Sequence, residues 1–217
     1  VAKYNSSGVL QWDKTLGGGS SSDRWESVAV DSSDNIIVCG RNTSSILLVA
    51  KYNSSGTLIW DKTLGSEAAN SYPDEGYGVT IDSSNNIIVC GKAIPSSGQG
   101  NYDVIVAKYN SSGVLQWDKG LGKNGALDGY AVIVDSLDNI IVCGNTPSAF
   151  SLLVAKYNSS GTLIWDKTLG SSGYEVGYGV TIDSSDNIIV CGYTGSSFTA
   201  VKAALVAKYN SSGVLQW

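Results

Sequence analysis

Residues 79–91 read Val-Thr-Ile-Asp-Ser-Ser-Asn-Asn-Ile-Ile-Val-Cys-Gly. The first three of these residues are β-branched and alternate in polarity, and residues 87–90 form a continuous apolar run. Both patterns favour strands, and the polar residues 83–85 between them have the composition of a tight turn. The stretch therefore predicts an antiparallel hairpin.

The hairpin belongs to a repeat that runs through all 217 residues. The block Asn-Ile-Ile-Val-Cys-Gly starts at Asn35, Asn86, Asn139 and Asn187. A second block, Val-Ala-Lys-Tyr-Asn-Ser-Ser-Gly, starts at Val1, Val49, Val106, Val154 and Val206, with spacings of 48, 57, 48 and 52 residues. Residues 1–12 and 206–217 are identical, which suggests a sequence cut from a longer array.

Each repeat has the length and pattern of four strands. After the hairpin comes a third apolar segment, such as residues 47–52, and the turn at 53–56 leads to a fourth segment at 57–63. The second and third segments are apolar on both faces, as in sandwiched strands, and the fourth alternates, as at an outer edge. A four-stranded antiparallel meander of this period is typical of a β-propeller blade. The alternative is a β-solenoid, whose coils are shorter and favour parallel pairing.

The composition excludes several classes of protein. The chain carries 14 Lys and Arg against 19 Asp and Glu, a net charge of −5, and its apolar content of 42% is too high for a disordered acidic tail. The acidic balance without a basic cluster argues against partners such as nucleic acid or an anionic membrane surface. No apolar stretch approaches the roughly 20 residues of a membrane helix. The absence of His removes a Ser-His-Asp triad and the commonest general base.

In such a meander the connections sort by face, because successive strands run in opposite directions. The first–second and third–fourth turns share one face and are nearly identical in every repeat, whereas the other connections vary and share the opposite face. Binding residues are usually carried on loops held by a rigid scaffold, so the variable face is the predicted ligand-binding surface. Its candidate residues are Trp25, Glu26, Tyr77, Tyr102, Tyr130, Tyr174 and Tyr178. Such aromatic rings stack on a sugar or a peptide, or they pack between blades with their hydroxyls at the rim.

Two further patterns have both structural and functional interpretations. Cys39, Cys90, Cys143 and Cys191 take the same place in successive repeats. Neighbouring sheets pack about 10 Å apart and a disulfide needs Cα atoms within about 7 Å, so the sequence predicts buried free thiols and no metal centre. The Asp-Ser-Ser-Asp-Asn turns resemble calcium loops superficially, but they lack the central Gly and closing Glu of the EF-hand pattern. Asx turns account for them better.

Five Asn-Ser-Ser triplets fit the acceptor pattern for N-glycosylation on exposed hairpin tips. Their asparagines are Asn5, Asn53, Asn110, Asn158 and Asn210. Asn-Ser-Ser-Gly is also a good turn sequence in itself, so these residues have a purely structural interpretation as well.

Catalysis has few candidate residues. The carboxylates Asp74, Glu75, Asp128 and Glu175 lie on the variable face, and paired carboxylates hydrolyse glycosides when they stand at the working distance. The sequence does not place any two of them together. No glycine-rich phosphate loop opens a helix, so no catalytic residue and no cofactor are predicted.

The combination of Val-Thr-Ile-Asp-Ser-Ser-Asp-Asn-Ile-Ile-Val-Cys-Gly with Val-Ala-Lys-Tyr-Asn-Ser-Ser-Gly-Thr-Leu-Ile-Trp resembles the bacterial SBBP β-propeller repeat and, more distantly, NHL-type blades. The resemblance covers essentially the whole chain. It implies a propeller fold and an extracellular or cell-surface location in a bacterium or archaeon, without an assigned reaction. The chain departs from the family in having Cys where Thr is more usual, and its four and a half repeats fall short of the seven blades that the family name implies.

We therefore predict an all-β protein, a β-propeller of four-stranded antiparallel blades with four full blades and an N-terminal half-blade that holds only a third and a fourth strand. The half-blade spans 1–16, and the blades span 17–65, 66–122, 123–170 and 171–217. The predicted function is that of a non-catalytic extracellular scaffold that recognises glycan or protein on its variable face. The alternatives are a structural unit that self-associates through its half-blade into a ring or filament, and a propeller enzyme of the hydrolase or quinoprotein type.

Overall fold

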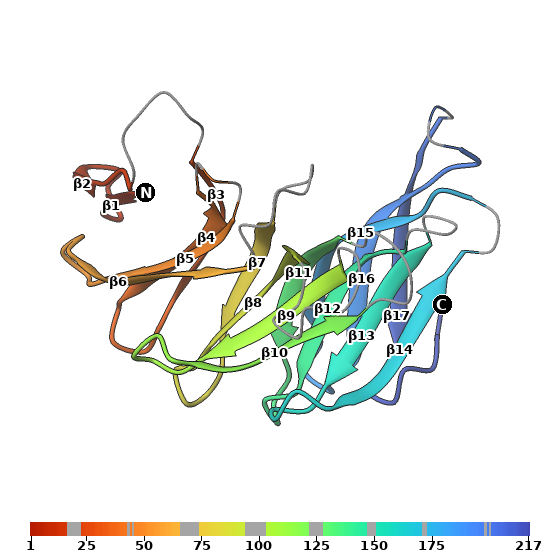
Figure 1. Ribbon diagram of the computed structural model, residues 1–217. Helices are drawn as coiled ribbons and strands as arrows, with labels where there is room; N and C mark the ends of the chain where they lie inside the picture. Colours follow the sequence, from red (N-terminus) through yellow and green to blue (C-terminus); the bar gives the residue numbers. More distant parts are fainter. Residues whose placement is uncertain are drawn as a thin grey trace.

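The computed structural model describes residues 1–16, 23–42, 44, 46–65, 74–93, 103–121, 128–146, 151–170, 173–197, 199 and 201–217. The regular secondary structure in these ranges consists of β-strands, numbered β1 to β17 in chain order (Figure 1). Among the described residues, none forms a helix of the length and apolarity that a membrane crossing requires. The chain is all-β, as its alternating and continuous apolar segments predict.

The described strands form a short hairpin followed by four sheets, in which neighbours in the chain pair antiparallel. The N-terminal hairpin consists of β1 (Ala2–Tyr4) and β2 (Leu10–Asp13). Sheet 1 consists of β3 (Arg24–Val30), β4 (Ile36–Arg41), β5 (Leu47–Tyr52) and β6 (Leu58–Leu64), and sheet 2 of β7 (Glu75–Ile81), β8 (Ile87–Ala93), β9 (Asp103–Tyr109) and β10 (Leu115–Leu121). Sheet 3 consists of β11 (Gly129–Val134), β12 (Ile140–Asn145), β13 (Leu152–Tyr157) and β14 (Leu163–Leu169), and sheet 4 of β15 (Val176–Ile182), β16 (Ile188–Thr194) and β17 (Ala203–Tyr209). The predicted four-stranded antiparallel repeat is confirmed in sheets 1, 2 and 3.

Sheet 4 differs from the predicted full blade, because its fourth segment is not a regular strand. Leu215 forms an isolated bridge with Tyr209. The Lys208 backbone N–H donates to the Trp217 carbonyl oxygen, and the Gln216 N–H donates to the Lys208 carbonyl oxygen. Residues 214–217 thus lie beside β17 in the place that the seven-residue strand β14 takes in sheet 3.

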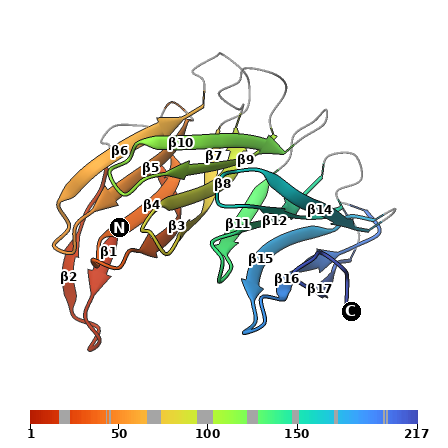
Figure 2. The same cartoon turned by 90° about the horizontal axis from the view of Figure 1, so that it is seen from below.

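The sheets stand side by side around an arc, with the N-terminal hairpin at one end and sheet 4 at the other (Figures 1 and 2). The first strand of each sheet is innermost, since β3 contacts β7, β7 contacts β11, and β11 contacts β15. The second, third and fourth strands follow outward in that order. This arrangement is propeller-like, and the described residues do not close it into a ring.

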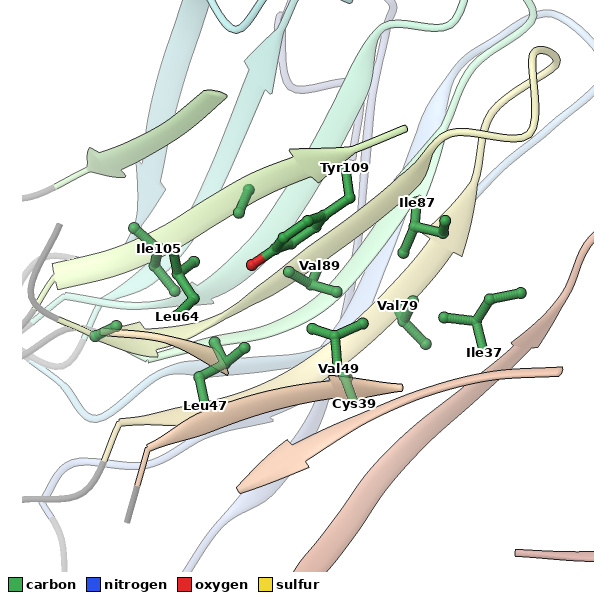
Figure 3. Packing of buried hydrophobic residues seen from close by; sticks show 12 residues of the cluster. Ile37, Cys39, Leu47, Val49, Leu64, Val79, Ile87, Val89, Ile105 and Tyr109 are labelled. Carbon is green, nitrogen blue, oxygen red and sulfur yellow. The ribbon is translucent and has the colours of Figure 1, made fainter. Parts of the chain in front are cut away.

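Apolar cores fill the spaces between neighbouring sheets. Between sheets 1 and 2, Cys39 and Val49 form one cluster with Val79 and Val89 (Figure 3). The same positions fill the next two interfaces, with Cys90, Val106, Val132 and Val142 between sheets 2 and 3, and Cys143, Val154, Val180 and Val190 between sheets 3 and 4. In sheets 1, 2 and 3 the continuous apolar runs of the second and third strands therefore line two cores, one on either side, and fully burying each such side chain stabilises the fold by about 1.5–3 kcal/mol.

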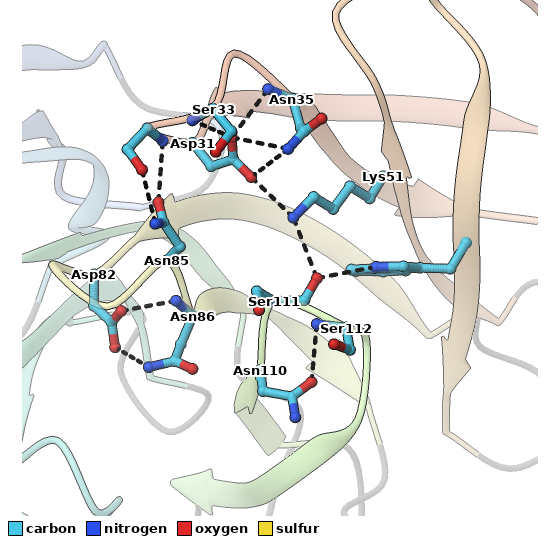
Figure 4. A network of polar contacts seen from close by, with 12 residues as sticks. Asp31, Ser33, Asn35, Lys51, Asp82, Asn85, Asn86, Asn110, Ser111 and Ser112 are labelled. Atoms are coloured by element: carbon cyan, nitrogen blue, oxygen red, sulfur yellow. Dashed lines mark hydrogen bonds and ion pairs between the residues drawn. The ribbon is translucent and has the colours of Figure 1, made fainter.

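The face that carries the first–second and third–fourth turns, here called the turn face, repeats one polar arrangement (Figure 4). Asp31 Oδ1 accepts hydrogen bonds from the backbone N–H groups of Ser33 and Asn35, and Asp31 Oδ2 lies 2.8 Å from Lys51 Nζ. Burial raises the pKa of Asp31, but hydrogen bonds from Lys51 and Asn35 outweigh burial and lower this pKa to about 2. Asp82, Asp135 and Asp183 repeat the arrangement with Lys108, Lys156 and Lys208. The Asx-turn interpretation of these aspartates is thus confirmed.

A second polar contact, here called the Lys–Trp clamp, joins each sheet to the next. Lys51 Nζ and Trp60 Nε1 both donate to the Ser111 carbonyl oxygen, at 3.2 and 3.3 Å. The other clamps are Lys3 and Trp12 on Ser54, Lys108 and Trp117 on Ser159, and Lys156 and Trp165 on Ser211. Every clamp reaches from the third and fourth strands of one unit to the third–fourth turn of the following sheet, so the turn face fixes the spacing of the sheets.

Candidate functional site

The candidate site lies where the innermost strands begin, on the variable face opposite the turn face. Each innermost strand carries a β-bulge there, in which one residue has no partner on the second strand. In β7, Gly76 pairs with Gly91 and Gly78 pairs with Cys90, so Tyr77 is the extra residue. The extra residues of the other innermost strands are Glu26, Tyr130 and Tyr178. Because a bulge re-aims its extra side chain, these four residues take equivalent places at the inner rim of the arc.

The glycine that ends each Asn-Ile-Ile-Val-Cys-Gly block makes room for the bulge. A Cβ on Gly91 would lie 1.9 Å from the Glu75 carbonyl oxygen. Gly40, Gly144 and Gly192 face equivalent carbonyl oxygens at 1.7 to 1.9 Å. No side chain fits at these positions without a shift of the backbone, so the glycine of the repeat is the sequence feature that permits the bulge.

The bulged tyrosines begin a continuous row of aromatic rings. The ring centroids of Tyr77 and Tyr130 lie 5.3 Å apart, and those of Tyr130 and Tyr178 lie 4.8 Å apart. The row continues to Tyr193, 5.7 Å from Tyr178, and to Tyr174, whose ring is stacked on Tyr193 at 6.0 Å. These five residues are here called the tyrosine run. Their tilted and stacked geometries are the ones in which aromatic rings attract each other.

Two carboxylates hold the hydroxyl groups at one end of the tyrosine run. The Tyr77 hydroxyl donates to Glu75 Oε2 at 2.5 Å, and the Tyr130 hydroxyl donates to Asp128 Oδ2 at 3.1 Å. Burial, followed by the neighbouring carboxylates, raises the pKa of both tyrosines. Both phenols therefore stay protonated at neutral pH, and their rings are held in place.

Basic side chains pair with the same carboxylates. Arg41 Nε lies 3.1 Å and Arg24 Nη2 lies 3.3 Å from Glu75 Oε1. Lys92 Nζ lies 3.6 Å from Asp128 Oδ1. The site therefore offers hydrogen-bond donors and acceptors side by side, next to apolar ring surface.

At the other end of the tyrosine run, a lysine covers two rings. Lys202 Nζ lies 4.1 Å from the ring centroid of Tyr193 and 5.3 Å from that of Tyr174, within the range of a cation–π interaction. Glu175, next to Tyr174 in the chain, accepts a hydrogen bond from Thr194 Oγ1 at 3.1 Å. This end of the site therefore also combines rings, a cation and a carboxylate.

The seven candidate residues predicted from the sequence leave out one set of site residues, although a signal for them was present. The residue directly after each Asn-Ile-Ile-Val-Cys-Gly block varies, and it is Arg41, Lys92, Asn145 or Tyr193. Arg41 and Lys92 pair with the site carboxylates, Tyr193 belongs to the tyrosine run, and the Asp128 backbone N–H donates to Asn145 Oδ1. A variable residue directly after a constant block thus marks the site. Lys202 carried no comparable signal, because it lies in the connection between the second and third strands, whose length and sequence differ in every repeat.

The structure brings together four of the seven predicted ligand-binding residues, namely Tyr77, Tyr130, Tyr174 and Tyr178. Glu26 takes the bulge position in sheet 1 and pairs with Arg24. Trp25 packs against the apolar cluster between the N-terminal hairpin and sheet 1. Tyr102 lies outside the described residues.

The four cysteines lie in the second strands and are free. Cys39, Cys90 and Cys143 are buried as predicted, whereas the prediction is wrong for Cys191, which is exposed because no sheet covers its side of sheet 4 among the described residues. Burial raises the pKa of Cys39 and Cys90 and raises that of Cys143 to about 12, which makes these thiols poor nucleophiles. Within the described ranges, no cluster of three or more Cys, Asp and Glu side chains is arranged to hold a metal ion.

The five candidate glycosylation asparagines lie in the third–fourth turns of the turn face. Asn53 Oδ1 accepts hydrogen bonds from the backbone N–H groups of Ser55 and Thr57. Asn5, Asn110, Asn158 and Asn210 accept the same pair of bonds from the residues two and four positions later. Turn geometry therefore accounts for asparagine at these places, and its glycosylation stays a prediction.

No protein-family model matches the chain, and no curated protein sequence matches it. Among solved structures, the chain is similar to a protein of unknown function from Dyadobacter fermentans, with a TM-score of 0.56 and 8% identity over 96% of this chain and 77% of that one. It is also similar to a protein of unknown function from Bacteroides caccae, with a TM-score of 0.55 and 14% identity over 94% of this chain and 66% of that one. A GH43 glycoside hydrolase matches with a TM-score of 0.51 and 11% identity, over 87% of this chain and 38% of its own. At these identities the similarity is one of fold alone, the chain spans only part of each structure, and membership of the SBBP family stays a prediction.

Proposed function

We propose that the chain is part of an extracellular β-propeller and binds carbohydrate, without catalysis, at the tyrosine run. In this proposal sheets 1 to 4 are blades and the N-terminal hairpin is half of a blade. The observation that carries the proposal is the run itself, in which each of the five rings lies within 6.0 Å of the next.

The chemistry of the site suits a sugar. The C–H faces of a sugar ring are apolar and stack on aromatic rings, whereas its hydroxyl groups need hydrogen-bond partners. Tyr178 supplies accessible ring surface, since it is 51% exposed. Lys92 and Asp128 stand beside Tyr130 and supply a donor and an acceptor. A saccharide that stacks along the run would therefore meet polar partners at its edge.

The partners of the carboxylates favour binding over hydrolysis. A glycosidase needs one carboxyl group free to deliver a proton and a second at a set distance from it. Glu75 is buried and engaged by Arg41 and Tyr77, and Asp128 is engaged by Tyr130 and Lys92. Both carboxylates thus position other side chains of the site. The proposed ligand class rests on the chemistry of the tyrosine run and not on the fold likeness to a glycoside hydrolase.

The test is a screen of the 217-residue chain against immobilised oligosaccharides, followed by titration calorimetry with the saccharide that binds most tightly. We expect Tyr130→Ala and Tyr178→Ala to raise the dissociation constant at least about tenfold, a loss of about 1.4 kcal/mol. The control is Tyr4→Ala on the N-terminal hairpin, which removes an exposed tyrosine away from the run and leaves binding unchanged.

Three results would overturn the proposal. The first is that the chain binds no saccharide, which would favour a protein ligand for the same surface. The second is that binding survives both substitutions in the tyrosine run, and the third is that sugar is released from the bound saccharide and Glu75→Gln stops the release, which would make the chain a hydrolase.

A further inference from the structure

An ammonium group of the chain itself already lies on one end of the tyrosine run. Lys202 Nζ is 4.1 Å from the ring centroid of Tyr193 and 5.3 Å from that of Tyr174. The two rings are nearly parallel, with an interplanar angle of 5° and centroids 6.0 Å apart. The face of an aromatic ring carries partial negative charge and attracts a cation. Tyr174 and Tyr193 therefore form a site for an ammonium group, here called the ammonium seat.

A carboxylate faces the middle of the tyrosine run. Asp128 Oδ2 accepts a hydrogen bond from the Tyr130 hydroxyl at 3.1 Å. Burial is the largest cause of the raised pKa of four tyrosines of the run, and the charge of Asp128 contributes to the increase at each of them, namely Tyr77, Tyr130, Tyr174 and Tyr178. A negative charge that acts on four of the five rings also stabilises a cation bound on those rings.

A second carboxylate lies beside the ammonium seat. Glu175 follows Tyr174 in the chain and is 8% exposed. Its Oε1 accepts the hydrogen bond from Thr194 Oγ1, whereas its Oε2 is buried and has no hydrogen-bond partner within the described residues. A carboxylate oxygen in this state makes the electrostatic potential around it negative, which favours a positive ligand group nearby.

The basic side chains of the site already have carboxylate partners. Arg24 and Arg41 each have a nitrogen within 3.3 Å of Glu75 Oε1, and Lys92 Nζ lies 3.6 Å from Asp128 Oδ1. A ligand carboxylate would therefore approach these cations only beside a carboxylate of the protein, and the two like charges would repel each other. The charges of the site thus favour a positive ligand group over a negative one.

We propose that the saccharide bound at the tyrosine run is an amino sugar, whose protonated amine takes the place of Lys202 Nζ on Tyr174 and Tyr193. The inference rests on the proposed carbohydrate site, since it names the class of sugar that the same rings bind. Without ligand, Lys202 occupies the ammonium seat and competes with the ligand amine. A cation–π contact at an exposed site is worth about two- to fivefold in a dissociation constant, so this competition lowers the affinity without preventing binding.

Three tetrasaccharides test the inference, because they share their rings and β-1,4 linkages and differ only at carbon 2. They are the tetramers of glucosamine, N-acetylglucosamine and glucose, which carry an amine, an acetamide and a hydroxyl group there. At about pH 5.5 the amine holds its proton and a carboxyl group with an ordinary pKa has lost its own. We expect titration calorimetry to show the glucosamine tetramer bound at least about fivefold more tightly than the other two, which is the worth of one charge contact at about 4 Å in water.

The outcomes separate this inference from the proposed function. If the glucose or the N-acetylglucosamine tetramer binds as tightly as the glucosamine tetramer, the amino-sugar assignment is wrong and carbohydrate binding stands. A galacturonic acid tetramer that binds more tightly than these three would also overturn the assignment, because its charge has the opposite sign. If none of them binds, this inference fails, and the oligosaccharide screen decides separately whether the proposed function fails with it.

Lys202→Met removes the internal competitor. We expect it to tighten binding of the glucosamine tetramer about two- to fivefold, because the amine no longer displaces a cation from the ammonium seat. Lys167→Met on the outer strand β14 is the matched control, since it removes the same charge from an exposed position away from the tyrosine run. Unchanged or weaker binding by Lys202→Met would overturn the competition.

Two carboxylate substitutions test the source of the preference. Asp128→Asn keeps an oxygen that accepts from Tyr130 but removes the charge, and Glu175→Gln keeps an acceptor for Thr194 Oγ1 in the same way. We expect each to reduce the preference for the glucosamine over the glucose tetramer by about two- to fivefold, the worth of one exposed charge pair. Asp166→Asn on β14 removes the same charge from an exposed position and leaves the preference unchanged. A preference that survives both site substitutions would overturn the assignment.

Competition by a simple salt tests the ammonium seat itself. Tetramethylammonium has no hydrogen-bond donor, and aromatic ring faces attract it through its charge. At equal concentration its chloride screens charges as strongly as sodium chloride does. We expect tetramethylammonium chloride to weaken binding of the glucosamine tetramer more than sodium chloride does. Equal effects of the two salts would overturn the assignment of the seat to Tyr174 and Tyr193.

Discussion

On the turn face the contacts between neighbouring sheets repeat, whereas on the variable face the residues around the bulge change from sheet to sheet. The turn face repeats the Asp–Lys pair of Asp31 and Lys51 in each sheet and the Lys–Trp clamp from each unit to the next. On the variable face, the bulge position holds Glu26 in sheet 1 and a tyrosine such as Tyr77 in the other sheets. The residue that follows the glycine of the second strand also changes from sheet to sheet. Contacts that join sheets are thus constant, and contacts that face solvent differ.

The comparison separates the contacts that stabilise the sheets from the side chains that are proposed to bind a ligand. The ion pair of Lys108 and Asp82 is almost fully buried. Removing one partner of such a pair lowers the free energy of unfolding strongly, because it leaves the other charge buried without a counter-ion. Tyr178, in contrast, is half exposed and contacts Tyr130 and Tyr193 at the rim. Substitutions on the turn face should therefore lower the free energy of unfolding, and substitutions at the rim should spare it.

The largest effect is expected for Lys108→Met. Lys108 Nζ lies 2.8 Å from Asp82 Oδ2 and donates to the Ser159 carbonyl oxygen of the next sheet. Its removal leaves a buried carboxylate without a counter-ion, which costs about 3–5 kcal/mol of unfolding free energy. Chemical denaturation at pH 7 measures the loss. Lys119→Met on the neighbouring strand β10 is the control, since Lys119 is exposed, and a loss below about 1 kcal/mol for Lys108→Met would contradict the role of the pair.

Gly113→Ala is expected to have the next largest effect, and Gly8→Ala is its matched control. Both glycines end the same Asn-Ser-Ser-Gly turn with positive φ, +81° and +77°, so alanine strains both by about 1–2 kcal/mol. At Gly113 a Cβ would also lie 2.8 Å from Trp60 Cδ2, whereas nothing lies within 4 Å at Gly8. The overlap with a packed ring adds about 1–3 kcal/mol. Equal losses on chemical denaturation would show that Trp60 does not hold the turn.

Much of the turn face and of the strand order could be predicted from the sequence, because the responsible residues recur at a fixed place in each repeat. Apolar runs such as residues 87–90 require burial on both sides. The aspartate that begins the turn after Ile81 is expected to accept hydrogen bonds from the backbone of that turn. The bulge beside Tyr77 could have been inferred as well, since a glycine inside a strand, here Gly91 on the paired strand, often marks a bulge.

The positions of the other side chains depend on contacts between sheets, which a local sequence pattern does not encode. Trp25 belongs by sequence to the row of rim residues but packs into the core beside the N-terminal hairpin. Lys202 reaches Tyr193 from the far end of a connection whose length and sequence differ from repeat to repeat. Cys191 has the same sequence neighbours as its buried equivalents and differs only in what lies beside its sheet.

The turn face should also make stability depend on pH in the acid range. Burial raises the pKa of Asp31, Asp82 and Asp135, but hydrogen bonds from the paired lysines and from Asn side chains lower it, to about 2 for Asp31. A carboxyl whose pKa is lower in the folded state contributes stability that is complete above its unfolded pKa of about 3.9 and is lost as pH falls through the folded value. We expect the free energy of unfolding to fall between about pH 4 and pH 2, by on the order of 1–2 kcal/mol for Asp31.

Denaturation curves at pH 7, 4, 3 and 2 measure that decline, and Asp31→Asn supplies the comparison. The variant is less stable at pH 7 because Lys51 loses its counter-ion, and its curve falls less steeply below pH 4 because one titrating group is gone. A parallel decline of both proteins would mean that Asp31 titrates alike in the folded and unfolded chain, against the short contact with Lys51.

The smallest effect on stability is expected for Tyr178→Ala, at about 1 kcal/mol. The ring is half exposed and its attraction to Tyr130 and Tyr193 is the main contribution it makes to the fold. The same substitution at Tyr157, which is 2% exposed in the core between sheets 2 and 3, should cost about 3–5 kcal/mol on chemical denaturation. Equal costs at the two tyrosines would mean that the rim stabilises the sheets as strongly as the core does. A small cost at Tyr178 would show that this ring of the tyrosine run contributes little to the stability of the sheets.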